Sequence, residues 1–309
     1  SNCVAILPVE TELGRKRTID QSSCNKDFSC VKGFCPSFVT VRGGKLKRPG
    51  ADAAAFDRPL PEPALPQLTQ GVFSLVITGV GGTGVVTIGA LLGMAAHLEG
   101  KGVGVLDMAG LAQKGGSVWT HMRFGASPAD IAAVRVATGG ADALLGCDLV
   151  VTAGSKTLSM VRQGRTRAVV NLQEVMPGNF THEPDLKFPG NPLMATIVKA
   201  VGQEATHAVD AGQLATALCG DAMATNLFML GIAYQQGMIP VGAKAIERAI
   251  EINGASVKMN LAAFGWGRRH AVDPDAVRRA AGGKAAAAPV MPLTAERRAE
   301  LLAQYQDQR

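Results

Sequence analysis

Residues 73–84 read Phe73-Ser-Leu-Val-Ile-Thr-Gly-Val-Gly-Gly-Thr-Gly84. An apolar run that ends in glycines is typical of a buried strand that turns directly into a helix. The residues that follow are mostly apolar as far as Glu99, which predicts that helix. Gly79, Gly81 and Gly84 also match the spacing G-x-G-x-x-G, in which a pyrophosphate lies at the N-terminus of the helix. Glycines here equally serve tight packing of the helix on the strand, so the motif alone leaves both interpretations open.

Further strand-like runs alternate with helical stretches after this turn. They are expected at 102–107, 117–124, 148–153 and 167–172. The alternation predicts an α/β fold with a Rossmann-like, doubly wound parallel sheet. Asp107, at the end of the second strand, is then expected near a ribose hydroxyl if a dinucleotide binds. Two later helices are expected at 221–236 and 241–251, and the first is apolar nearly all round, which predicts that it is buried.

Outside these motifs the polar residues give weaker signals. His97 lies on the predicted helix after the glycines and is expected to be a surface or packing residue. His121 follows Trp119 on the predicted strand at 117–124 and is a candidate for a side chain that faces a cleft. No residue is singled out as catalytic.

Four of the six cysteines lie in the first 35 residues: Cys3, Cys24, Cys30 and Cys35. The last three form a C-x5-C-x4-C-P run that ends at Pro36. Thiolates bind iron, and a proline directly after the last cysteine is typical of ferredoxins. We therefore expect a [4Fe-4S] cluster. A structural zinc site usually has C-x2-C pairs, which are missing, and disulfides are disfavoured without a secretory signal, so these alternatives are weaker but open.

The net charge of +6 is concentrated at the start of the chain. Residues 1–50 contain nine Lys or Arg and four Asp or Glu, which gives 9 − 4 = +5. These cations surround the cysteines, so we expect them to accompany an anionic cluster and do not expect a nucleic-acid partner. No uninterrupted apolar run is long enough to span a bilayer, so we expect no membrane association. We expect the protein to be cytoplasmic. The chain starts at Ser1 with a cysteine two residues later, and we expect it to be cut from a longer protein.

The composition divides the chain into four parts. Residues 1–48 are the cysteine-rich segment, and 49–72 are a Pro/Ala-rich linker. Residues 73–272 are the Rossmann-like domain, and 273–309 are a second linker with the start of a further helix.

Several stretches resemble one family of enzymes. Cys3, the run Thr11-Glu-Leu-Gly-Arg-Lys-Arg17 and residues 21–38 resemble the end of the ferredoxin-like segment of the long, fused indolepyruvate:ferredoxin oxidoreductases. The glycine turn, Ala112-Gln-Lys-Gly-Gly-Ser117 and residues 247–266 resemble the gamma domain of 2-oxoacid:ferredoxin oxidoreductases. Many relatives have Arg where this chain has Lys114, a departure that weakens a bidentate phosphate contact but keeps the positive charge.

The resemblance implies a part of an enzyme that oxidatively decarboxylates a 2-oxoacid, of the indolepyruvate or arylpyruvate type, to an acyl-coenzyme A. It implies thiamine diphosphate on other catalytic domains or subunits, and electrons relayed through iron–sulfur clusters to ferredoxin. The complete enzyme is expected to be a homo-oligomer. No thiamine diphosphate motif is present here, so the chain is not expected to turn over a 2-oxoacid alone.

The resemblance also implies two sets of site residues. The metal ligands are expected to be Cys3, Cys24, Cys30 and Cys35. The cofactor-binding residues, with coenzyme A as the candidate ligand, are expected to be Gly79, Gly81, Gly82, Thr83, Gly84, Lys114, Gly115 and Gly116. Two other functions stay open: a stand-alone NAD(P)- or flavin-dependent dehydrogenase that uses the glycine turn and Asp107, and a non-catalytic interaction module stapled by zinc.

Overall fold

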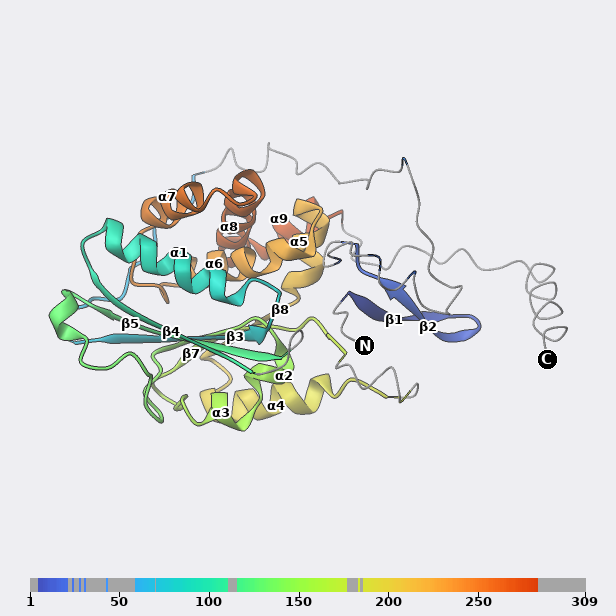
Figure 1. Cartoon of the computed structure of the whole chain (residues 1–309), viewed down its shortest axis with the longest axis horizontal. Helices are drawn as coiled ribbons and strands as arrows, with labels where there is room; N and C mark the ends of the chain where they lie inside the picture. The colour runs from blue at the N-terminus through green and yellow to red at the C-terminus, as the bar shows by residue number, and fades with distance from the viewer. Residues whose placement is uncertain are drawn as a thin grey trace, which may run out of the picture.

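A computed structural model describes residues 5–21, 24, 28, 31, 43, 59–69, 71–110, 116–176, 183 and 186–282. Most of these residues form an α/β domain, and the first of them form a separate hairpin (Figure 1). Among the described residues, no helix is long and apolar enough to cross a membrane.

Six strands form the central sheet in the order β4-β5-β3-β6-β7-β8. Their bounds are β3 Phe73–Val80, β4 Gly102–Ala109, β5 Ser117–Gly125, β6 Ala143–Gly146, β7 Arg167–Asn171 and β8 Thr206–Val209. β3, β6, β7 and β8 pair in parallel, whereas β5 is antiparallel to both β3 and β4. The predicted α/β class is confirmed, but the sheet is mostly parallel and not entirely so. For β5 to lie parallel to β4, the connection between them would need about a dozen residues or more. Only residues 110–116 join the two strands, so they pair antiparallel.

The strand predicted at 148–153 is wrong. Those residues form the short helix α2, Leu149–Thr152, and the strand lies earlier, at β6. The carboxylate of Asp148 accepts a hydrogen bond from the backbone N–H of Val151 at 2.8 Å, which caps the helix. Local capping thus starts a helix within an apolar run that also has strand character.

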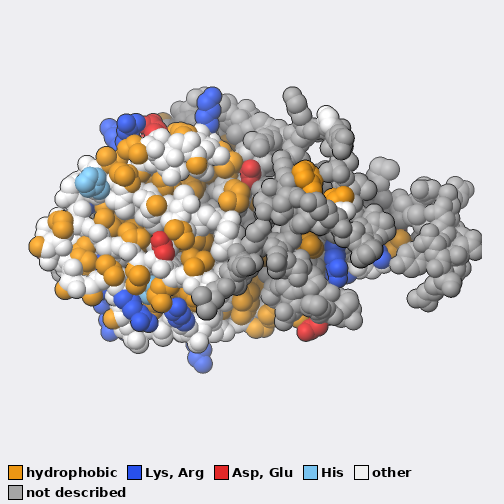
Figure 2. All heavy atoms as spheres, viewed as in Figure 1, with side chains coloured by type: hydrophobic (Ala, Val, Ile, Leu, Met, Phe, Trp, Pro, Cys, Tyr) orange, Lys and Arg blue, Asp and Glu red, His pale blue; other side chains and the backbone are white. Residues whose placement is uncertain are grey.

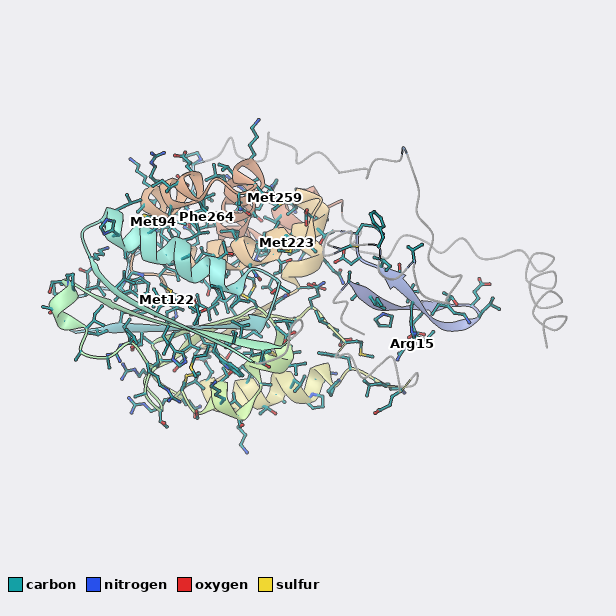
Figure 3. All side chains as sticks on the ribbon, viewed as in Figure 1. Arg15, Met94, Met122, Met223, Met259 and Phe264 are labelled. Atoms are coloured by element: carbon teal, nitrogen blue, oxygen red, sulfur yellow. The ribbon has the colours of Figure 1, made fainter. Side chains whose placement is uncertain are left out.

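Helices cover both faces of the sheet (Figure 1). One face carries α1 Val85–Leu98, α5 Ala211–Cys219, α6 Thr225–Gln235, α7 Ala243–Asn253, α8 Val257–Val272 and α9 Pro274–Ala280. The other carries α2, α3 Ser155–Leu158 and α4 Gly190–Val201. Side chains alternate along β3, so Leu75 and Ile77 enter the core under α1 and Val76 enters the core of the other face. Met122 of β5 and Phe264 of α8 lie in the larger core (Figure 3).

The two predicted later helices are confirmed as α6 and α7. All residues of α6 from Thr225 to Tyr234 are buried, as its apolar composition predicts. Residues 59–69 of the predicted linker pack on α6 and α8 without regular secondary structure. Glu62 accepts hydrogen bonds from the Tyr234 hydroxyl at 2.7 Å and from Arg268 at 2.9 Å.

The hairpin was not anticipated. β1, Ile6–Thr11, pairs antiparallel with β2, Gly14–Ile19, through a tight turn in which Gly14 has a φ of +85°. Nη1 of Arg15 donates a hydrogen bond to the backbone oxygen of Leu186 at 2.6 Å, which ties the hairpin to the segment before α4.

Candidate functional site

The glycine turn joins β3 to α1, as predicted. Gly82 and Gly84 have φ values of +90° and +91°, a backbone conformation that residues with a Cβ rarely adopt. The backbone N–H of Gly81 donates to the carbonyl oxygen of Gly116 at 2.7 Å. The structure therefore brings together two segments that the resemblance identified separately, the glycine turn and the end of 112–117.

Packing accounts for part of the glycine pattern. A Cβ at Gly79 would collide with Cγ2 of Val85 and lie 3.3 Å from Cβ of Cys147. Nδ2 of Asn226, which is buried, donates to the carbonyl oxygen of Thr83 at 2.7 Å. Hydrogen bonds to Gly116, the residue before β5, and from Asn226 of α6 thus hold the turn. On its other side, a Cβ at Gly82 would meet no atom of the described residues within 4 Å.

Asp107 does not occupy the position that a dinucleotide requires. β5 lies between β3 and β4, so Asp107 is two strand spacings, about 10 Å, from the strand that leads to the turn. Its carboxylate accepts a hydrogen bond from the Thr120 hydroxyl at 2.5 Å and lies against Gly89, beyond the first turn of α1. The expectation that Asp107 would reach a ribose at the N-terminus of α1 is not supported by this placement.

Most of the predicted metal ligands lie outside the described residues. These are Cys3, Cys30 and Cys35; Lys114 and Gly115 of the glycine set are outside as well. Cys24 is described and is partly buried. The cluster and its ligands therefore stay a prediction. Among the residues that the structure describes, no group of three or more His, Cys, Asp or Glu is placed to hold a metal ion.

The other two cysteines are thiols in apolar surroundings. Burial, and secondarily the charge of Asp148, raises the pKa of Cys147 to about 12. Burial and then Asp221 raise the pKa of Cys219 to about 11. Thiols with such pKa values are poor metal ligands and poor nucleophiles at neutral pH.

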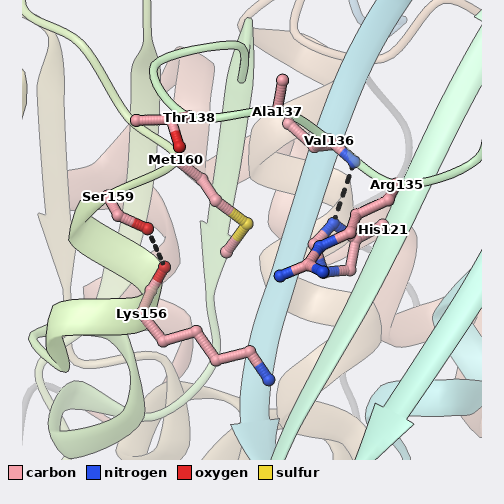
Figure 4. A pocket seen from close by; sticks show the side chains of 8 residues that line it. All are labelled: His121, Arg135, Val136, Ala137, Thr138, Lys156, Ser159 and Met160. Carbon is pink, nitrogen blue, oxygen red and sulfur yellow. Dashed lines mark hydrogen bonds between the residues drawn. The ribbon is translucent and has the colours of Figure 1, made fainter.

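A cavity of about 390 Å³ lies on the sheet face opposite α1. Its lining comes from β5, from the connection between η2 (Pro128–Asp130) and β6, and from α3 with the two residues after it (Figure 4). The lining residues are His121, Arg135, Val136, Ala137, Thr138, Lys156, Ser159 and Met160. The suggestion that His121 faces a cleft agrees with this cavity, but no sequence motif indicates Arg135 or Lys156, because the fold brings them together from separate segments.

Comparison with known proteins points to one family. A model of the pyruvate ferredoxin/flavodoxin oxidoreductase family matches residues 74–270, more than half of the 309 residues. The chain is 27% identical over 208 residues to the indolepyruvate oxidoreductase subunit IorB of Archaeoglobus fulgidus, a match that covers 66% of this chain and 98% of that subunit. It is 29% identical over 197 residues to the subunit of the same name from Thermococcus kodakarensis, covering 63% of this chain and 94% of the relative.

Among solved structures, the gamma subunit of a keto/oxoacid ferredoxin oxidoreductase from Geobacter sulfurreducens PCA is similar. The sequence identity is 19% and the TM-score is 0.46, with 65% of this chain and 98% of that chain covered.

Proposed function

The chain belongs to the pyruvate ferredoxin/flavodoxin oxidoreductase family, and we propose that it is the gamma-type part of an indolepyruvate-type 2-oxoacid:ferredoxin oxidoreductase. The family that the sequence resemblance predicted is thereby confirmed. The family match over residues 74–270 carries the proposal, and the relatives named indolepyruvate oxidoreductase subunits suggest the substrate. Thiamine diphosphate, held by other domains or subunits, would supply the carbanion-stabilising chemistry of decarboxylation.

Residues 1–48 are proposed to carry the iron–sulfur cluster that passes electrons to ferredoxin. The hairpin lies between Cys3 and Cys24 in the sequence, and its Arg15 binds the backbone of Leu186. An electron relay needs its cluster close to the rest of the enzyme, because transfer slows with distance. The hydrogen bond to Leu186 is consistent with such an arrangement.

The glycine turn is proposed as a contact for coenzyme A. No atom of the described residues lies within 4 Å of a Cβ built at Gly82, which leaves room among them for a ligand to approach the backbone closely. Backbone N–H groups just before a helix favour a phosphate group. Lys114, two residues before Gly116, would add a positive charge beside the turn.

The surface of α1 supports packing against other catalytic domains. Val86, Met94 and Leu98 on this helix are 43%, 38% and 45% exposed. Figure 2 shows hydrophobic side chains interspersed over the described part of the face that it views. These side chains would add apolar area to such an interface, and the subunit names of the relatives are consistent with one.

The cluster is tested by replacing one cysteine. We expect Cys30→Ser to lose its iron and the visible absorption that dithionite bleaches, because a cubane needs four ligands. Iron per chain and the visible spectrum of anaerobically purified protein are the measurements. Cys219→Ser is the matched control and should keep its iron. Undiminished iron in Cys30→Ser would exclude this ligand, and stoichiometric zinc in the wild type would support the zinc-stapled module.

A stand-alone dehydrogenase is the second candidate, and the G-x-G-x-x-G spacing is what favours it. The position of Asp107 opposes it, so we expect no NADH binding at physiological concentrations. Calorimetry with NADH measures this directly. Micromolar affinity that is abolished by Gly81→Val, which places side-chain atoms near the carbonyl oxygen of Gly116, would favour the dehydrogenase.

A further inference from the structure

The cavity at His121 is separate from the glycine turn. His121 pairs with Val76 in the middle of β3, whereas the turn follows the end of that strand. Thr120, the preceding residue, lies against Gly89 of α1. Because side chains alternate along a strand, His121 points to the opposite face of the sheet, toward α3 (Figure 4).

His121 offers a hydrogen-bond donor without a partner. The residue is 1% exposed, and its Nδ1 accepts a hydrogen bond from the backbone N–H of Val136 at 3.1 Å. A neutral imidazole that accepts at Nδ1 carries its hydrogen on Nε2. Nε2 is buried and has no hydrogen-bond partner in the described part of the chain. Buried donors are normally satisfied, and His121 lines the cavity, so a ligand bound there would supply the acceptor that Nε2 lacks among the described residues.

Two cations line the same cavity as His121. Lys156 extends from α3, with its Nζ 3.8 Å from the ring centroid of Trp119, and Arg135 extends from the connection before β6. The indole Nε1 of Trp119 donates to the Thr157 hydroxyl at 2.9 Å, which fixes the ring under the ammonium group. Among the residues described, no carboxylate oxygen lies within 4.0 Å of Arg135 or Lys156.

The electrostatics agree with an anion site. Burial first, and then the charges of Arg135 and Lys156, lower the pKa of His121. The imidazole is therefore neutral at physiological pH and keeps Nδ1 as an acceptor for Val136. The positive potential of the two cations is then left for a ligand.

We propose that this cavity binds the phosphate group of a small phosphate monoester, with Nε2–H of His121, Nζ of Lys156 and the guanidinium of Arg135 as donors. A phosphate group carries a charge of about −1.5 to −2, which matches two cations better than a carboxylate does. It also has enough acceptor oxygens for all three donors.

The size of the cavity favours an ester over free phosphate. Its volume of about 390 Å³ is at the lower end of the range for small-molecule sites, roughly 300–1,000 Å³. Val136 and Met160 provide apolar lining for the rest of the molecule. Ser159 donates its own hydroxyl to the carbonyl oxygen of Lys156 at 2.8 Å, so toward a ligand it is an acceptor that suits a hydroxyl group.

Calorimetry of the 309-residue chain with glycerol phosphate, inorganic phosphate and acetate tests the proposal. We expect glycerol phosphate to bind, and Lys156→Gln or Arg135→Gln to weaken binding at least about tenfold, because each removes a charge-assisted hydrogen bond. Lys199→Gln, an exposed cation on α4 outside the cavity, is the matched control and should bind as the wild type does. In ¹⁵N-histidine-labelled protein, the Nε2 resonance of His121 should shift with glycerol phosphate.

Tighter binding of glycerol phosphate than of inorganic phosphate supports the monoester, whereas equal or tighter binding of inorganic phosphate overturns it in favour of a site for free phosphate. The proposal is overturned if neither phosphate compound binds, if acetate binds equally well, or if both cavity variants retain wild-type affinity. The phosphate site does not depend on the proposed electron relay. The cavity variants should leave the iron content unchanged, so measuring iron distinguishes a failure of this proposal from a failure of the electron relay.

Discussion

Gly267→Ala is expected to destabilise the protein by about 3 kcal/mol, the upper part of the range for overpacking a core. Gly267 of α8 and Gly231 of α6 lie where these two helices cross. A Cβ at Gly267 would overlap the carbonyl oxygen of Phe228 and lie 3.0 Å from Cα of Gly231. Both obstacles are backbone atoms, so the helices must move apart to admit the methyl group. Phe228 and Phe264, buried at this crossing, would lose contacts as they separate.

Gly93→Ala is the matched control because it makes the same change inside another helix. Among the described residues, a Cβ at Gly93 of α1 would meet only Cγ2 of Val105, at 3.5 Å, which is an ordinary contact. Alanine is favoured over glycine in a helix interior by about 1 kcal/mol, so this variant should be more stable than the wild type. Urea unfolding followed by circular dichroism measures the free energy of unfolding of both variants. Equal stability of Gly267→Ala and the wild type would show that the crossing can expand without cost.

Local patterns predicted the elements of the fold better than their order. The turn from β3 through Gly79–Gly84 into α1 was predicted because its apolar run and glycines are neighbours in the sequence. The insertion of β5 between β3 and β4 depends on pairing between distant residues. One local signal was available, since residues 110–116 are too few for a parallel crossover. Two further local signals went unused: Asp148 suits the N-cap position that it occupies before α2, and Gly14 suits the positive φ at the end of the hairpin turn.

The candidate sites also differ in how well the sequence predicts them. The cysteine run and the glycine turn could be identified because their residues are close in the sequence. The cavity at His121 could not, because Arg135 and Lys156 are surface-type residues in unremarkable stretches. For Asp107, the sequence predicted a position at the glycine turn that the fold does not give it. Its distance in sequence from the glycines fits a dinucleotide site, but strand order decides its distance in space.

The last prediction concerns stability in acid. His270 on α8 is 4% exposed and packs against Phe228 and His207, with ring centroids 5.7 Å and 6.1 Å away. Burial first, then the charges of His207 and Arg278, lower the pKa of His270 to about 4. Burial also lowers the pKa of His207. Both rings are therefore neutral in the folded protein at pH values where an unfolded histidine is protonated.

The sign of the pH dependence follows from these values. An unfolded histidine has a pKa of about 6.5, so between that pH and about 4 the unfolded state binds a proton at position 270 that the folded state does not. The stability that His270 contributes is fully present above the pKa of the unfolded state. It is lost as the pH falls toward the pKa of the folded state. A shift of this size corresponds to about 3 kcal/mol of lost stability across the window.

Replacing His270 with phenylalanine should remove this loss. The measurement is the free energy of unfolding in urea at a series of pH values from 8 down to 4. The slope against pH is compared, so a constant packing cost of the new ring does not affect the result. Burial also lowers the pKa of His207, so part of the slope should remain. His97→Gln, at an exposed position on α1, should keep the wild-type slope. If His270→Phe also keeps it, protonation at position 270 does not drive acid unfolding, and the remaining slope belongs to His207 and the carboxylates.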